Sequence, residues 1–103
     1  MKKGVLEMCI LAIISREEVY ASDIIERLKK ENLIVVEGTL YPMLSRLKKA
    51  GHLDHFWLES QAGPPRKYYK LTPSGEKFLN QLTESWNTMV QSVSGLTSKK
   101  SKQ

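Results

Sequence analysis

Segment 38–51 carries a repeating apolar pattern that constrains the fold more strongly than any other feature of the chain. Its apolar residues recur at positions i, i+3, i+4 and i+7, which is the spacing of one helix face: Leu40, Met43, Leu44 and Leu47. The outward face has hydroxyl and basic side chains and no acidic residue: Thr39, Ser45, Arg46 and Lys49, with Tyr41 and Lys48 on its flank. Pro42 falls in the first turn, where a missing N–H costs little, and Gly51 suits the left-handed position just past a helix end. Such a helix fits a DNA major groove, and an ordinary solvated helix is the alternative that this segment alone leaves open.

The residues before this segment predict a partner helix. Its apolar side chains follow the same spacing: Ala21, Ile24, Ile25 and Leu28. Segment 16–19 reads as a polar turn, and Ser22 or the residues just before it can cap the helix. Lys29 and Lys30 lie near its C-terminal end, where the helix dipole favours cations, and 33–36 is a short apolar connector. Two short amphipathic helices with a compact link, the second basic on its outside, predict a helix-turn-helix.

After Gly51 the helical spacing stops and a β-hairpin is predicted. Segment 52–59 mixes aromatic, aliphatic and polar residues, 60–65 is a cluster of turn residues, and 66–72 alternates as a strand does. We expect Pro64 and Pro65 at the tip and Arg66 and Lys67 at the start of the return strand. A hairpin directly after a recognition helix is a wing, whose cations would meet phosphate along the backbone or at the minor groove. A solvated hairpin with two surface cations is the alternative.

The first and last segments predict helices that one small domain cannot cover. Segment 4–15 is almost continuously apolar, which indicates a helix buried on more than one side. From Thr72, a plausible N-cap, and Pro73, apolar residues step by three and four: Leu79, Leu82, Trp86, Met89, Val93 and Leu96. This period of about 3.5 residues is typical of a helix that packs along a partner helix. We expect the helix to end at Gly95 after roughly 34 Å, and to form a homodimer.

The two motifs around the predicted helix-turn-helix and wing resemble the signature of PadR-type transcriptional regulators. The first comprises Gly-Thr-Leu-Tyr-Pro at 38–42, Arg-Leu at 46–47 and Gly51; the second is Gly-Pro-Pro-Arg-Lys-Tyr-Tyr-Lys-Leu-Thr-Pro-Ser-Gly at 63–75. Their order and spacing match, and the resemblance runs from about Gly4 to about Leu96. It implies a winged helix-turn-helix repressor that dimerises through a C-terminal helix and leaves its operator when a small molecule binds. The single C-terminal helix is similar to the compact branch of the family.

Two positions depart from the family pattern. The family often has Gly-Tyr at the start of the second helix, where this chain has Ala21 and Ser22, so the tyrosine–phosphate contact that the resemblance implies has no tyrosine here. Ser22 could donate to a phosphate instead, but more weakly. The wing often carries another arginine where Pro64 stands. We therefore expect somewhat weaker backbone contact than the full pattern would give. Lys48, Lys49, Arg66 and Lys67 are expected on phosphate, whereas Thr39, Tyr41 and Arg46 are the candidates for base edges.

Trp86 lies in the middle of the predicted dimer seam, where a heptad position normally takes Leu or Ile. Two indoles there could splay and leave an apolar slot between the subunits, lined also by Met89 and by Leu6, Met8 or Ile10 of the first helix. In multidrug-responsive relatives an aromatic residue of the corresponding Glu-Ser-Trp segment flanks a planar ligand, so the resemblance implies a flat aromatic effector. The alternative is that Trp86 simply fills the dimer core.

Composition excludes several other classes of function. The chain of 103 residues has a net charge of +5, which favours an anionic partner such as nucleic acid, and it has no apolar run of about 20 residues that could span a membrane. Its single cysteine, Cys9, suits a reducing cytoplasm and reads as a small buried hydrophobe. His52 and His55 have the spacing of a weak metal motif but lack a third certain ligand. Neither a phosphate-binding loop nor a nucleophile beside a base is present, so we expect no enzyme, no cofactor and no metal.

Together these patterns predict a mainly α fold with a β-hairpin: a winged helix-turn-helix plus a C-terminal dimerisation helix. The expected organisation is a DNA-binding domain at 1–72, a dimerisation helix at 73–96 and a disordered tail at 97–103. The expected function is sequence-specific, homodimeric transcriptional repression at an inverted-repeat operator in double-stranded DNA, with release by a small molecule. A winged-helix module that binds a protein or RNA, with no DNA operator, is the alternative.

Overall fold

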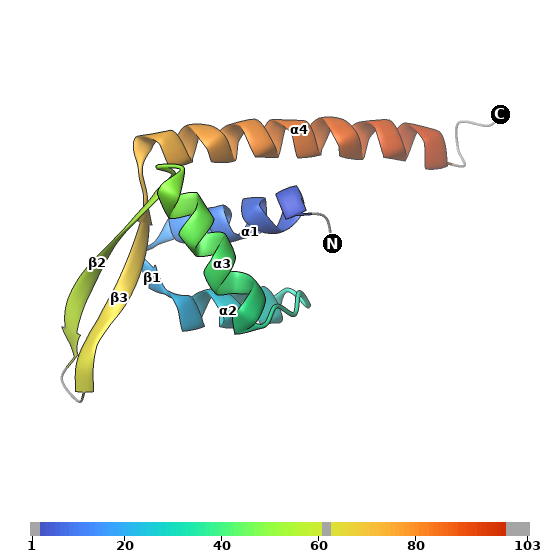
Figure 1. Cartoon of the computed structure of the whole chain (residues 1–103). Helices are drawn as coiled ribbons and strands as arrows, with labels where there is room; N and C mark the ends of the chain where they lie inside the picture. The colour runs from blue at the N-terminus through green and yellow to red at the C-terminus, as the bar shows by residue number, and fades with distance from the viewer. Residues whose placement is uncertain (1–2, 61–62, 99–103) are drawn as a thin grey trace.

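The computed structural model describes residues 3–60 and 63–98 and has the predicted winged helix-turn-helix architecture. Over these described residues the elements follow in the order α1 (Lys3–Arg16), β1 (Val19–Tyr20), α2 (Ala21–Lys30), α3 (Glu37–Lys49), β2 (Leu53–Ser60), β3 (Gly63–Leu71) and α4 (Pro73–Thr97). The strands form an antiparallel sheet in the order β1-β3-β2. Figure 1 shows α4 alongside α1 and continuing beyond it, with the hairpin of β2 and β3 projecting from the other end of the molecule.

The core is formed where α1, α2 and α3 meet the base of the sheet. Its buried side chains come from every one of these elements: Leu6, Ile10, Leu11, Ile13, Ile14, Val19, Ala21, Ile24, Leu28, Val35, Leu40, Met43, Leu44, Leu47, Leu53 and Tyr69. The predicted stripes of α2 and α3 are confirmed, because their apolar residues all pack on this core and only Ile25 is partly exposed. The apolar residues of α1, which the sequence could not tell apart, fall into two groups. Some are buried in the core, whereas Val5, Met8 and Cys9 are only half-buried.

The predicted helix ends at Gly51 and Thr72 are confirmed, and they hold α3 and α4 together. Gly51 has φ +85°, which an L side chain rarely adopts, and its carbonyl accepts a hydrogen bond of 2.6 Å from the Thr72 hydroxyl. The same hydroxyl accepts from the backbone N–H of Gly75 at 3.0 Å and caps α4. One threonine thus joins the end of the recognition helix to the start of the long C-terminal helix.

The start of α2 differs from the prediction. Val19 and Tyr20 form the short strand β1, paired with Tyr69 and Tyr68, whereas the sequence placed Val19 at the end of a polar turn over 16–19. The helix begins at Ala21 with Tyr20 at its N-cap, and the Asp23 carboxylate accepts a hydrogen bond of 3.1 Å from the Tyr20 N–H. The sequence allowed Ser22 or a residue just before it as the cap, and the structure has the second of these, with Ser22 exposed in the first turn. A two-residue strand has no alternation to recognise, so only its pairing with a distant strand reveals it.

The wing also differs, because Pro64 and Pro65 belong to β3 and not to the tip. Leu58 pairs with Arg66 and Ser60 with Gly63, so the two prolines lie opposite the single residue Glu59. This is a β-bulge, one of the few places where a strand accepts proline without losing a ladder hydrogen bond. Residues 61 and 62, at the centre of the predicted turn, lie outside the described residues.

Helix α4 continues through Gly95 to Thr97, two residues beyond the predicted end. At 25 residues it is about 37 Å long. Its first half packs on the core through Phe78, Leu79 and Leu82, whereas residues 83–97 are all exposed. Most of the predicted disordered tail, residues 99–103, lies outside the described residues.

Candidate nucleic-acid interface

The face of α3 opposite its buried apolar stripe carries polar and basic side chains that are exposed. Thr39, Ser45 and Arg46 are exposed, as are Lys48 and Lys49 near the C-terminal end. Tyr41 is 48% exposed, although Leu40 immediately before it is fully buried. The exposed Glu37 is the one acidic residue of the helix and lies in its first turn. A basic and hydroxyl-bearing helix face is therefore available to a polyanion.

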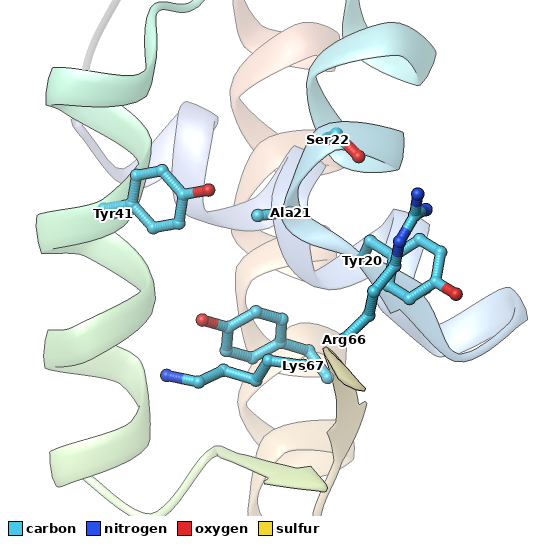
Figure 2. Close-up of a pocket in the computed structure, with 7 residues that line it drawn as sticks. Tyr20, Ala21, Ser22, Tyr41, Arg66 and Lys67 are labelled. Carbon is cyan, nitrogen blue, oxygen red and sulfur yellow. The ribbon is translucent and has the colours of Figure 1, made fainter. Parts of the chain in front are cut away.

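A cavity of about 320 Å³ joins this helix to the wing. Four elements line it: Tyr20 of β1, Ala21 and Ser22 at the start of α2, Tyr41 of α3, and Arg66, Lys67 and Tyr69 of β3. In Figure 2 the Tyr41 side chain points from α3 toward α2, while Lys67 and Arg66 enter from β3. Four of the predicted DNA-binding residues, Ser22, Tyr41, Arg66 and Lys67, thus meet at one site although they come from separate parts of the sequence.

Arg66 and Lys67, predicted as a pair of cations, are directed to different neighbours. The Arg66 guanidinium carbon lies 4.7 Å from the Tyr20 ring centroid, whereas the Lys67 ammonium lies 5.6 Å from that of Trp57 and 6.0 Å from that of Tyr69. The reason is strand alternation, which sends adjacent side chains to opposite faces of the sheet. Aromatic contacts of this kind hold long cationic side chains in place without neutralising their charge.

An aromatic cluster that the sequence reasoning missed fixes the wing to α2. The Tyr20 and Tyr68 ring centroids are 3.9 Å apart, and Phe56 stacks on Tyr68 at 5.6 Å with an interplanar angle of 14°. A hydrogen bond with Tyr20, followed by burial, raises the pKa of Tyr68. Because Tyr20 is also the N-cap of α2, the cluster couples the position of β3 to that helix.

Tyr69 contributes a hydroxyl that stays protonated. It is 5% exposed and lines the cavity together with Tyr41. Burial, and then the neighbouring Tyr41, raises the pKa of Tyr69 above its ordinary value. At neutral pH the phenol is therefore a hydrogen-bond donor. The cavity offers phenol and serine hydroxyls with two cations at its edge, which is the chemistry that binds a phosphate oxygen.

A second, apolar pocket of about 170 Å³ lies between α1 and α4. It is lined by Gly4, Val5, Met8, Leu82, Ser85, Trp86 and Met89. Of the residues predicted for an effector slot, Met8, Leu82, Trp86 and Met89 line it. Leu6 and Ile10 do not line it, because both are buried on the core side of α1, at 8% and 0% exposure. Of the three α1 residues that the sequence offered as alternatives, Met8 is the one that faces this pocket. Leu79 packs on the core, and Val93 is exposed farther along α4.

The two histidines have separate surroundings. His52 Nδ1 lies 2.9 Å from the Ser74 hydroxyl, and its ring stacks on Phe78 at 4.3 Å, so it joins the end of α3 to α4. His55 lies on β2, edge-on to Trp57. Within residues 3–60 and 63–98, His, Cys, Asp and Glu side chains nowhere gather in threes that could hold a metal ion. None of the helices in that same part of the chain is long and apolar enough to cross a membrane.

A helix-turn-helix followed by a basic hairpin, with cation and hydroxyl groups shared between them, defines the class of winged-helix DNA-binding proteins. Comparison with known proteins narrows this class. Residues 10–81 match the model of the transcriptional regulator PadR-like family, so the chain belongs to that family. It is therefore a DNA-binding transcriptional regulator and not an enzyme.

Solved structures of similar proteins match this fold over nearly the whole chain. A PadR-like transcription factor from Bacteroides fragilis is 54% identical over 92% of each chain, with a TM-score of 0.81. A PadR-like transcriptional regulator from Bacillus cereus is 40% identical over 93% of this chain and 94% of that one, with a TM-score of 0.85. A protein from Streptococcus mutans is 41% identical, with 92% of this chain and 88% of that chain covered, and has a TM-score of 0.82.

Proposed function

We propose that the protein is a homodimeric, sequence-specific repressor that binds an inverted-repeat operator and is released by a planar small molecule. In this proposal the winged helix-turn-helix at residues 1–72 binds DNA, and α4 is the dimerisation helix, which extends one residue beyond the expected range of 73–96. The observation that carries the DNA-binding part is the cavity in which Ser22, Tyr41 and Lys67 converge from α2, α3 and β3. It makes the helix-turn-helix and the wing one continuous surface.

The cavity changes the role proposed for one residue. The sequence placed Tyr41 among the residues that read base edges, but its side chain points across the cavity toward α2 (Figure 2). We therefore assign Tyr41 to a phosphate, together with Ser22, Arg66 and Lys67, and keep Lys48 and Lys49 as further phosphate contacts. Thr39 and Arg46, with Ser45 beside them, remain for the base edges of the major groove.

The exposed half of α4 supports a dimer. Trp86, Met89, Val93 and Leu96 recur at three- and four-residue steps, and with Val90 beside them they are between 39% and 86% exposed. A stripe of this size on a helix that projects from the core is typical of a helix–helix interface. A second copy of the chain is the occupant with a matching stripe, and two-fold pairing is the commonest symmetry of soluble oligomers.

The apolar pocket supports an effector beside that interface. Trp86 is 39% exposed and Met89 47%, and both line the pocket against Met8 of α1. In a dimer paired through α4, two such pockets would face each other, and a flat aromatic molecule could stack on the indoles. Its binding would change the angle between the two wings and so favour a state that no longer fits the operator.

Two experiments test this function. Duplexes selected from a random-sequence pool should bind the protein far more tightly at physiological salt than random duplex or bulk RNA; equal binding to all three would indicate an interaction module of another kind. In a Trp57→Phe background, proflavine should quench the remaining Trp86 fluorescence, and Trp86→Ala should keep operator binding while losing release by the dye. Failure to quench at any accessible concentration would place the effector site elsewhere.

A further inference from the structure

The wing carries a large aromatic side chain that the proposed contacts do not use. Trp57 of β2 is 60% exposed, more than Tyr41 or Trp86. An indole left in water forgoes the stabilisation that burial of so large an apolar surface would give. The neighbouring Leu58, at 42%, is also exposed, so exposure alone does not mark Trp57 as a binding residue. Its position on the wing does.

Trp57 continues the surface that begins at the cavity. It pairs with Lys67 across the hairpin, and the next pair toward the core on the same face joins His55 to Tyr69. Lys67 and Tyr69 both line the cavity, and the Lys67 ammonium lies 5.6 Å from the indole centroid. A row of side chains therefore runs from the cavity through Lys67 to Trp57. Leu58 pairs with Arg66 instead and belongs to the opposite face.

Charge identifies the chemistry of the partner. A cation beside an exposed indole fits a ligand with an anionic group next to an apolar surface, which describes the phosphate and deoxyribose of a DNA strand. Glu59, two residues nearer the tip, is exposed and would repel phosphate, so the contact should centre on Trp57 and Lys67. Apolar side chains of minor-groove-binding proteins pack against sugars and base steps in this way.

We propose that Trp57 is a DNA-contacting residue whose indole packs into the minor groove beside the phosphate held by Lys67. This inference rests on the proposed DNA-binding function and adds a specificity residue to it. The groove floor carries an amino group wherever a G·C pair stands, and that group obstructs an inserted ring. Each half-site should therefore prefer A·T pairs where the wing lies.

The first test compares variants of the full chain on the tightest duplex selected from a random-sequence pool. Trp57→Ala should weaken binding about tenfold, equivalent to about 1.4 kcal/mol, and Trp57→Phe should lose much less. Leu58→Ala, which removes apolar surface from the adjacent exposed residue paired with Arg66, is the matched control and should lose much less affinity than Trp57→Ala. The salt dependence separates the roles: its slope should stay unchanged for Trp57→Ala and fall by about one unit for Lys67→Ala.

The second test locates the groove. In a Trp86→Phe background the selected duplex should shift and quench the emission of Trp57. Replacing adenines under the wing by 2,6-diaminopurine adds a minor-groove amino group, which should weaken the wild type but not Trp57→Ala. Equal weakening of both proteins, or Trp57→Ala binding as the wild type does, would overturn the inference and leave the proposed function standing. A wild type that selects no sequence over random duplex would overturn both.

Discussion

Gly75 stands where the first turn of α4 crosses the loop that follows α3, and a side chain has no room there. A Cβ at this position would collide with the backbone carbonyl of His52, which cannot move without displacing the end of α3. We expect Gly75→Ala to lower the free energy of unfolding by about 1–3 kcal/mol in chemical denaturation. Gly38→Ala, in the first turn of α3 with no atom within 4 Å, is the control. It should change stability by less than about 1 kcal/mol, in the stabilising direction; similar losses from both would contradict the packing argument.

Substitutions in the proposed DNA interface should fall into two groups: some should lower affinity for every duplex, and others should lower discrimination between sequences. Tyr41→Phe and Lys67→Ala remove phosphate contacts, so each should weaken operator and random duplex alike. Arg46→Ala, and Thr39→Ala to a lesser degree, should instead relax discrimination by roughly 1–3 kcal/mol at one base pair. Titrations of each variant against operator, single-base substitutions and random duplex provide the measurement. A Tyr41→Phe variant that loses affinity for the operator alone would return Tyr41 to the base-reading group.

The two halves of α4 have different surroundings and different proposed roles. Its first half packs on the core, and its second half presents the apolar stripe that includes Val93, which is 50% exposed. Val93→Glu places like charges on both sides of a two-fold seam and should convert the dimer to a monomer in analytical ultracentrifugation. Gln91→Glu adds the same charge on the opposite side of the helix and should remain dimeric. The same helical content for both variants in circular dichroism would show that the monomer is folded.

For the molecule as a whole, pairing through α4 fixes how the two DNA-binding surfaces can be arranged. A two-fold dimer should bind an inverted repeat whose half-sites lie about one helical turn, ~34 Å, apart. We expect sedimentation of the complex to give two chains per duplex, and insertion of half a turn between the half-sites to abolish tight binding. A wild-type monomer at micromolar concentration, or binding indifferent to the insertion, would contradict this arrangement.

Local sequence determined the features that depend on near neighbours. The stripe of α3 follows from the spacing of Leu40, Met43, Leu44 and Leu47 alone, and those four side chains are buried as predicted. Gly51 and Thr72 were identified in the same way, because helix ends have residue preferences that act within one turn. The family signature consists of these same local motifs, so it was also readable from the chain.

Features that depend on contacts between segments far apart in the chain were determined only by the tertiary structure. The strand at Val19 and Tyr20 exists because β3 pairs with it, and the bulge at Pro64 and Pro65 exists because β2 fixes the register on either side. The continuously apolar α1 gave no sign of which residues, such as Leu6, face the core and which, such as Met8, face α4. Periodicity cannot report a contact between residues far apart in the chain, because the spacing that reveals a helix or strand involves only its own residues. The cavity that joins Ser22, Tyr41 and Lys67 therefore emerged only when the three elements were packed together.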